Sequence, residues 1–468
     1  MRRLLPVLLA ALVACQVDVE GAPCRPGHAE DCPSGQGCGL DKKCSLLCGE
    51  QSGALGCKCP PNDGPEFAAD PAGSRIEDAP YPTGVMSPVA CRFGRLGDAL
   101  DAAAAYATSH ADTGAVTRAY GDAPVFGVAE TGEAFPLHVA AGVTLIGTES
   151  TNALTTVRAD SSPLAAVIDL QGVIERVALE GAAAEGVGVA ASCGATGTPS
   201  LRHVAVDGAG LLATGVAVSG ACGADLDDVE VRQTVRAALL VDAAERATVN
   251  VVGGGFRESG IGVEVRGGTL HLEGPPGVVP TFLSGFTNGV TLEVVGNANH
   301  GIALVGGATP ITLGVSRVRI SGNAGTGIRI DDLPTGSSVA VVDSEISGNT
   351  SLSDGSLYAS GRRAGGLILN QSVPPPFVFK GNVVACNDGD QLGFYASSVE
   401  PMKIGPDACG PESNFVRTKT GATAVFVSPY ISVDARNNFW APDPPTYVGT
   451  GFVYRDACPI EPPPPVCP

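Results

Sequence analysis

The segment Gly186-Val-Gly-Val-Ala-Ala-Ser-Cys-Gly-Ala recurs 29 residues later as Gly215-Val-Ala-Val-Ser-Gly-Ala-Cys-Gly-Ala. Apolar side chains in both copies alternate with small or polar ones, which is the pattern of a strand with one buried face. A repeat of this length is typical of a solenoid, in which each unit buries its apolar face on its neighbours. The two segments therefore predict adjacent coils of a solenoid.

Further copies extend the pattern through the chain. The same unit recurs, more weakly, as Ser259-Gly-Ile-Gly-Val, Asn288-Gly-Val-Thr-Leu, His300-Gly-Ile-Ala-Leu, Thr326-Gly-Ile-Arg-Ile and Ala364-Gly-Gly-Leu-Ile-Leu. A second unit lies between the copies, as Leu201-Arg-His-Val-Ala-Val, Leu226-Asp-Asp-Val-Glu-Val, Val315-Ser-Arg-Val-Arg-Ile and Val339-Ala-Val-Val. Each coil thus contributes at least two short strands. The spacing varies more than in a propeller or a leucine-rich repeat, which favours a parallel β-helix with coils of about 20 to 30 residues.

Asparagines mark the turns between these strands. Asparagine tolerates left-handed backbone angles, and amides stacked on successive coils can form a hydrogen-bonded ladder. The alternative is that these asparagines bind a ligand. The residues concerned are Asn323, Asn349, Asn382, Asn414 and Asn438.

The cysteines of the repeat region predict three disulfides. Cys193 and Cys222 have the same separation as their flanking repeats. Adjacent coils lie about 4.8 Å apart, which a disulfide can bridge. Cys458 and Cys467 flank a Pro-rich loop and form the second predicted pair. Cys386 with Cys409 is the third, by elimination.

A short N-terminal stretch is rich in cysteine and poor in aliphatic residues. So small a segment cannot bury enough apolar surface to fold unaided, and disulfides are the usual substitute. Together with Cys91, the cysteines of this stretch number eight, and how they pair stays open. They are Cys24, Cys32, Cys38, Cys44, Cys48, Cys57, Cys59 and Cys91. A zinc site formed by Cys57, Cys59 and His28 is the alternative, although the spacing is not that of a zinc ribbon.

The pattern of composition divides the rest of the chain. Residues 62–90, rich in Pro, Asp and Ala, predict a linker. The β-helix is expected over 91–451 and opens on a short helix, because Leu96, Ala99, Leu100 and Ala103 recur at helical spacing. Residues 452–468 form a Pro-rich tail with a disulfide loop. The predicted fold is therefore all-β, a right-handed parallel β-helix with an N-terminal capping helix, preceded by a small disulfide-rich module.

The first residues, MRRLLPVLLAALVAC, combine two arginines with an apolar run too short to span a bilayer. Leu12-Val-Ala-Cys15 resembles the lipobox of bacterial lipoproteins, which implies a signal peptide over 1–14 and lipidation of Cys15. An ordinary cleaved signal is the alternative. Without Cys15, 14 of the 15 cysteines remain, an even number that suits an oxidising compartment. We therefore expect an extracytoplasmic protein held by a lipid anchor in the bacterial envelope, at the outer membrane or the cell surface. Residues 15–61 then comprise the anchor and the cysteine-rich module.

The body resembles the right-handed β-helix families, the pectin-lyase-like proteins and the NosD type. Phe93-Gly-Arg-Leu-Gly-Asp-Ala-Leu followed by Leu137-His-Val-Ala-Ala-Gly-Val is similar to their helix-then-strand entry, and Asn437-Asn-Phe-Trp440 is similar to the closing signature of the NosD type. The resemblance implies an architecture and no particular activity, since one fold hosts many functions.

No catalytic arrangement stands out, and we predict no catalytic residue, metal or cofactor. The nearest candidates are two acidic doublets with nearby arginines, Asp227-Asp228 with Arg232 and Asp331-Asp332 with Arg329. Neighbours on a strand point to opposite faces, so neither doublet forms a carboxylate pair by itself, and both are interpreted as solvated turn acids. The six histidines are scattered and lack metal-ligand spacing.

The formal net charge of −19 argues against nucleic acid as a partner and disfavours acidic polysaccharides. Of three candidate functions, the third, a copper-related maturation role implied by the resemblance to the NosD type, is disfavoured because the chain has only 3 Met and no His pair. The first is an envelope lipoprotein that presents its β-helix surface to a glycan or to another envelope protein, as a binding or structural element. The alternative is a carbohydrate-active enzyme, a polysaccharide lyase or glycoside hydrolase. The small share of aromatic residues, 5%, favours the first.

Overall fold

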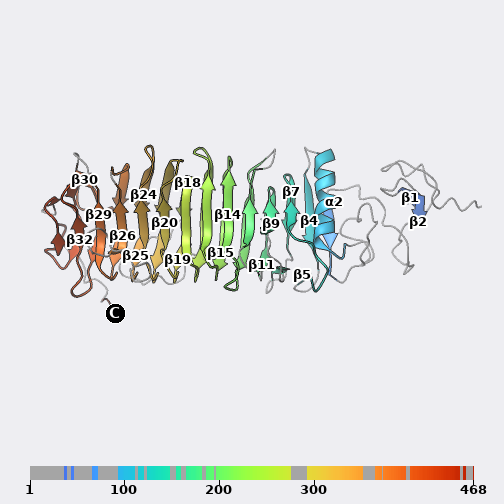
Figure 1. Ribbon diagram of the computed structural model, residues 1–468, viewed down its shortest axis with the longest axis horizontal. Helices are drawn as coiled ribbons and strands as arrows, with labels where there is room; N and C mark the ends of the chain where they lie inside the picture. Colours follow the sequence, from blue (N-terminus) through green and yellow to red (C-terminus); the bar gives the residue numbers. More distant parts are fainter. Residues whose placement is uncertain are drawn as a thin grey trace, which may run out of the picture.

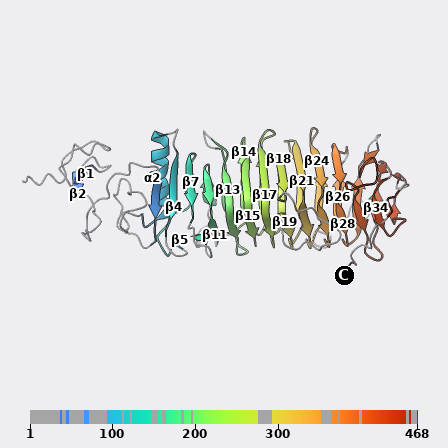
Figure 2. The ribbon, with the colours of Figure 1, turned by 180° about the vertical axis from the view of Figure 1, so that it is seen from behind.

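The computed structural model describes residues 36–38, 44–46, 66–71, 93–110, 114–120, 124–147, 154–159, 165–181, 186–193, 197–275, 292–350, 364–371, 373–396, 401–453, 457–459 and 467. Their main body is a rod of stacked parallel strands with a helix at its N-terminal end (Figure 1). The rear view shows the same stack continuing to the C-terminal strands (Figure 2). The predicted right-handed parallel β-helix is confirmed.

Each complete coil contributes strands to three ribbons. The first ribbon contains β3 (Glu66–Ala69), β4 (Ala115–Ala119), β7 (Val143–Ile146), β10 (Val173–Glu175), the first halves of β13 (Ser200–Asp207), β15 (Ala224–Arg232) and β17 (Thr248–Arg257), the second half of β18 (Ile261–Glu273), then β21 (Ile311–Ser316), β24 (Ser338–Val342) and β27 (Phe377–Lys380). A separate parallel sheet follows, made of β30 (Met402–Lys403), β33 (Val433–Asp434) and β36 (Phe452–Val453).

The second ribbon contains β5 (Val125–Gly127), β8 (Thr155–Ala159), β11 (Val177–Gly181), the second halves of β13, β15 and β17, then β19 (Leu292–Val295), β22 (Val318–Ser321), β25 (Glu345–Ser347), β28 (Val383–Ala385), β31 (Phe415–Arg417) and β34 (Phe439–Ala441). The third contains β6 (Leu137–Val139), β9 (Ala166–Leu170), β12 (Val187–Ala191), β14 (Thr214–Gly220), β16 (Ala237–Ala243), the first half of β18, then β20 (Ile302–Val305), β23 (Ile328–Asp331), β26 (Ala364–Asn370), β29 (Asp390–Tyr395), β32 (Val425–Val427) and β35 (Tyr447–Val448).

The bend between the first and second ribbons needs only one residue, which explains why the sequence suggested two strands per coil. Arg176, His203 and Asp228 occupy this position on successive coils, with φ of 58°, 51° and 52°. A single left-handed residue turns the chain while the strand pairing continues on either side. In β13, β15 and β17 the two ribbons therefore merge into one long bent strand.

The pairing register of the two defining segments differs from the sequence alignment. The repeat aligns Val187 with Val216, whereas the structure pairs Val189 with Val216. Side chains alternate along a strand, so a shift from Val187 to Val189 keeps the same residues inside. Cys193 and Cys222 are joined, with a Cα separation of 5.4 Å. Between the end of the paired strands and the cysteine, the second coil is longer than the first. The predicted bond therefore forms although the predicted register is wrong.

Asparagine side chains form two ladders inside the turns. In the first, Nδ2 of Asn297, Asn323 and Asn349 each donates to Oδ1 of the next asparagine, at 2.8 to 2.9 Å, and Asn387 donates to Gln391. In the second, Asn382 donates to Asn414 and Asn414 to Asn438. The buried amides also accept backbone N–H groups of the neighbouring coil. The predicted ladder is present, divided between two turns.

Helix α2 (Leu96–Ser109) covers the first coil, as predicted for a capping helix. Its apolar face, which includes Leu96 and Leu100, is buried against the first strands. Arg95 at the N-cap makes no side-chain capping bond. Instead the buried carboxylate of Glu133 accepts the N–H groups of Leu96 and Gly97, at 2.7 and 3.0 Å. A carboxylate at a helix N-terminus satisfies free N–H groups and complements the helix dipole.

The expected domain boundaries need correction at both ends of the body. Residues 62–90 are not all linker, because β3 lies within them, buries Phe67 and pairs with β4 as the first rung of the helix. At the other end β36 extends the stack to Val453, past the predicted limit of 451. Both strands belong to the body because each buries an apolar side chain in the core, Phe67 in β3 and Phe452 in β36. In the cysteine-rich module, β1 (Gln36–Cys38) and β2 (Cys44–Leu46) form an antiparallel pair. The predictions for Cys15, Cys24, Cys32, Cys48, Cys57, Cys59 and Cys91 lie outside the described residues.

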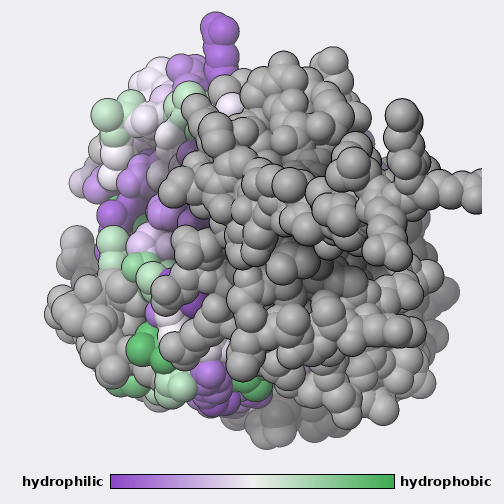
Figure 3. Space-filling view, turned by 90° about the vertical axis from the view of Figure 1, so that its right-hand side faces the viewer, coloured by the Kyte–Doolittle hydropathy of each residue, from purple (hydrophilic) through white to green (hydrophobic). Residues whose placement is uncertain are grey.

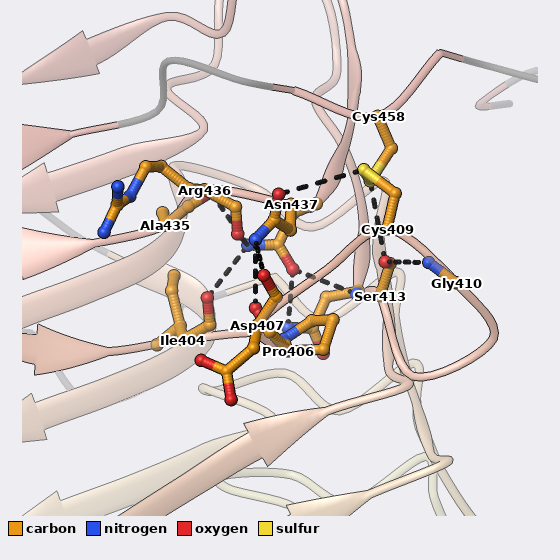
Figure 4. Close-up of a disulfide and its surroundings, with 12 residues drawn as sticks. Ile404, Pro406, Asp407, Cys409, Gly410, Ser413, Ala435, Arg436, Asn437 and Cys458 are labelled. Atoms are coloured by element: carbon orange, nitrogen blue, oxygen red, sulfur yellow. Dashed lines mark hydrogen bonds between the residues drawn. A yellow bond between two sulfur atoms is a disulfide. The ribbon is translucent and has the colours of Figure 1, made fainter.

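Two disulfides tie the C-terminal tail back to the stack. Cys386 bonds to Cys467 and Cys409 to Cys458, so the predicted pairs Cys458–Cys467 and Cys386–Cys409 are wrong. Figure 4 shows Cys458 beside Cys409 and near the Ser413 hydroxyl, whose oxygen lies 3.6 Å from the Cys458 sulfur. Beside this bond, the Cys458 N–H donates to the carbonyl of Asn438. Tertiary contact therefore decides the pairing, and proximity in sequence does not.

Candidate ligand-binding face on the third ribbon

Side chains on the outer side of the third ribbon line up across successive coils. The pairing registers place Glu264, Ala303, Arg329, Ile368, Gly393 and Phe426 in one column. A neighbouring column consists of Val305, Asp331, Asn370 and Tyr395. We call the polar and aromatic members, together with two flanking arginines, the third-ribbon face: Arg236, Glu264, Arg266, Arg329, Asp331, Asn370, Tyr395 and Phe426.

Glu264 is the most enclosed acid of this face, with 4% of its side chain exposed. Its Oε1 accepts from Nη2 of Arg236 at 3.2 Å and from Nε of Arg266 at 2.7 Å. Its Oε2 is buried and has no hydrogen-bond partner among the described residues. Burial raises the pKa of this carboxyl, Arg236 opposes the rise, and the charge of Asp242 adds to it.

Arg329 and Asp331 form an ion pair along β23. Nδ2 of Asn370, on the next coil, donates to the other oxygen of Asp331 at 3.0 Å. His300 lies beside this group and its Nδ1 accepts the N–H of Thr326 at 3.1 Å. The neutral ring then carries its proton on Nε2. Arg329 Nη1 lies 3.3 Å from Nε2, but both atoms are donors in this tautomer, so the contact is not a hydrogen bond.

An aromatic pair ends the face toward the C-terminus. Tyr395 and Phe426 stack with ring centroids 4.5 Å apart and an interplanar angle of 21°. Both rings stand on outer positions of the ribbon, on adjacent strands. Phe426 is buried, with 8% of the residue exposed, and Tyr395 is half-buried, so Tyr395 contributes most of the exposed area of the pair. An aromatic edge beside hydrogen-bonding groups suits a ligand with one apolar side and many hydroxyls.

A cavity of about 380 Å³ opens where β23 and β26 end. Its lining is mostly apolar, with Leu333 and the run Pro374 to Pro376, and Asp332 and Gln371 add polar atoms. The Gln371 amide oxygen accepts the N–H of Leu333 at 3.3 Å. The cavity therefore adjoins the column that contains Asp331 and Asn370.

The structure separates the two acidic doublets singled out in the sequence. Asp227 is exposed and Asp228 occupies the left-handed bend, where its Oδ2 lies 3.0 Å from Nδ1 of His203. Arg232 pairs with Asp207 on the second ribbon. Both doublets thus lie where the chain turns, but Asp331 belongs to the third-ribbon face, whereas Asp332 has φ of 45° and lines the cavity.

Sequence reasoning missed six of the eight residues of the face: Arg236, Glu264, Arg266, Asn370, Tyr395 and Phe426. The available signal was weak, because each is one polar or aromatic residue on or next to an ordinary strand. Only the register between coils brings them together.

Two kinds of site are absent from the described ranges. No group of three or more His, Cys, Asp or Glu residues in them is arranged to hold a metal ion. Within the same ranges, no helix has both the length and the apolar character that a membrane span requires. Figure 3 views the rod from the α2 end, where the described surface in view is largely hydrophilic with small apolar areas.

Comparison with known proteins finds weak structural similarity and assigns no family. No family model matches the sequence, and no curated protein matches it. Among solved structures, the chain is similar to the A-module of mannuronan C-5 epimerase AlgE4 from Azotobacter vinelandii, with 13% identity over 71% of this chain and 95% of that one, at a TM-score of 0.40. The AlgE6 A-module of the same organism gives 13% identity over 78% and 96%, at 0.29. The chain is a parallel β-helix protein with polar and aromatic side chains aligned along one ribbon.

Proposed function

We propose that this protein binds an extended glycan along the third-ribbon face. The observation that carries the proposal is the alignment of charged, amide and aromatic side chains on consecutive coils of one ribbon. Neighbouring coils are spaced by about 4.8 Å, close to the length of one pyranose unit. A glycan that follows the rod axis would therefore pass about one coil of the face for each sugar.

The chemistry of the face fits such a ligand. Arginine, carboxylate and amide groups supply donors and acceptors for hydroxyl groups, and the half-buried Tyr395 ring, backed by the buried Phe426 ring, supplies apolar contact. The groups are held in place before binding, because the Arg329–Asp331 pair and Asn370 are linked across coils. Preorganised groups lose less conformational entropy when a ligand binds.

Glycan cleavage is a second candidate, favoured by one observation. Glu264 is nearly buried and its pKa is raised, as suits a group that donates a proton. Cleavage by the usual route needs a second carboxylate, and Asp331, two coils along, is the other acid of the face.

We also propose that the protein is exported and anchored through Cys15. The three disulfides within the described residues support an oxidising compartment. A Cys15→Ser variant should be released from the membrane fraction, whereas wild type should remain in it and incorporate labelled fatty acid.

The test of function is a glycan-array screen on the soluble protein that begins at Gln16, with released sugars analysed in the same wells by mass spectrometry. Binding without product supports the binding role, and product supports cleavage. Silence in both channels would contradict the proposal.

A further inference from the structure

The Glu264 carboxylate occupies an unusual position within the third-ribbon face. It lies between two arginines that remain substantially exposed, with 45% of the Arg236 side chain and 38% of the Arg266 side chain open to solvent. Both guanidinium groups contact the same oxygen, Oε1. The second oxygen, Oε2, is buried and unpaired among the described residues. A buried polar atom without a partner is rare in a native structure and calls for an explanation, such as a bound hydroxyl or water.

The charges around this carboxylate balance locally. Arg236 precedes β16, Arg266 lies on β18 beside Glu264, and Asp242 lies on β16. On the other side β20 carries no titratable side chain, and His300 precedes it. Two positive charges therefore face two carboxylates. Removal of the Glu264 charge would leave the two exposed guanidinium groups with Asp242 alone.

We propose that Glu264 determines the ligand class of the third-ribbon face, which takes neutral sugars and rejects polyuronates, and that its Oε2 accepts a sugar hydroxyl. This inference rests on the proposed glycan binding. An ionised Glu264 occupies the donors that would otherwise bind a uronate carboxylate. It also repels such a group directly, and repulsion of the wrong ligand is an efficient source of specificity. The net charge of −19 acts in the same direction.

Both arginines contact Oε1, so the proposal requires that a shift of the Arg236 or Arg266 side chain opens a path for a hydroxyl to the buried Oε2. Long, partly exposed arginine side chains can shift while their aliphatic stems stay packed. The hydroxyl then donates to Oε2, and Oε1 keeps one guanidinium. No covalent step is involved.

The experiment compares wild type, Glu264→Gln and Glu345→Gln by isothermal titration calorimetry at pH 7.5 against soluble glucomannan and polygalacturonate. Glu345 is a matched control, because its Oε2 is also buried and unpaired among the described residues but it lies on the second ribbon. The expected result is wild-type binding of glucomannan only. Glu264→Gln should lose at least about tenfold in affinity for glucomannan and gain binding of polygalacturonate, and Glu345→Gln should match wild type.

Preference of wild type for polygalacturonate, or an unchanged ratio of the two affinities in Glu264→Gln, would overturn the inference while glycan binding itself stands. Failure of wild type to bind either polymer or any glycan of the array would count against the proposed function instead. Thermal unfolding of each variant establishes that a lost signal reflects the face and not the fold.

Discussion

Asn349 and Asn387 are 38 residues apart in the chain, yet Nδ2 of Asn349 donates to Oδ1 of Asn387 at 2.9 Å. The neighbouring step of the ladder, from Asn323 to Asn349, covers 26 residues at the same distance. Loop length between coils therefore varies without changing the internal spacing. Ligand-facing positions keep their alignment for the same reason, since the coils stack at a constant distance whatever the loops contain.

Asn349→Ala should destabilise the fold markedly. The amide is fully buried, and it donates to Asn387 and to the Ile320 carbonyl while it accepts from Asn323. Its removal leaves buried partners unsatisfied, at a cost of about 2 to 4 kcal/mol. Chemical denaturation measures the change. Asn250→Ala is the control, because that exposed side chain donates to Asp225 at the surface, and its loss should cost less than about 1 kcal/mol. Equal effects of the two variants would contradict the account.

Glu133→Ala should loosen helix α2. The carboxylate caps the helix from 36 to 37 residues away, and the Thr131 hydroxyl also donates to it, at 2.9 Å. Loss of a cap typically costs about 0.5 to 2 kcal/mol. Hydrogen exchange should then become faster at Leu96 and Gly97 in particular. Glu130→Ala serves as the control, since Glu130 is exposed and pairs with Arg158 instead. Unchanged exchange in Glu133→Ala would show that the cap is unimportant.

The raised pKa of Glu264 predicts a specific dependence of stability on pH. A carboxyl with a higher pKa in the folded chain holds its proton more tightly there, so its ionisation opposes folding. The stabilisation from the protonated Glu264 carboxyl is complete below its pKa in the unfolded chain, about 4.3. It is lost as pH rises through the higher pKa of the folded chain. The unfolding free energy of wild type minus that of Glu264→Gln should therefore fall from pH 4 upward. A difference that grows with pH would have the wrong sign.

Peptide mapping under non-reducing conditions should recover Cys193–Cys222, Cys386–Cys467 and Cys409–Cys458. The last two bonds close long loops, which in chain-entropy terms restricts the unfolded state more than a short loop would. The Cys409→Ser/Cys458→Ser double variant should lose about 2 to 4 kcal/mol. Recovery of a Cys458–Cys467 peptide would contradict the structure.

The stack itself was predictable because its cause is local. Alternation such as Val187, Val189 and Ala191 sets which side chains face inward, and repetition of the unit implies stacking. The exact register was not predictable, since pairing Val216 with Val187 or with Val189 buries the same side chains. The capping helix followed from periodicity, but the role of Glu133 depends on a contact between distant segments.

The candidate face escaped prediction for a related reason. Glu264 and Asp331 are unremarkable in sequence, and they share a surface only because β18, β20 and β23 pair in order. Tyr395 and Phe426 likewise stack from separate coils. For the disulfides of the tail, the sequence suggested a contact that the fold does not make. Nearness in sequence favoured Cys458 with Cys467, whereas the structure joins Cys458 to Cys409.

The most direct test of glycan binding on the third-ribbon face is the affinity of wild type and Tyr395→Ala for the glycan that the array identifies, measured by calorimetry. Tyr430→Ala is the control, because Tyr430 is 73% exposed and lies outside the face. We expect Tyr395→Ala to lose about three- to tenfold in affinity, as for the loss of one aromatic contact, and Tyr430→Ala to keep the wild-type affinity. Equal affinity of all three proteins would contradict the assignment of this face as the binding site.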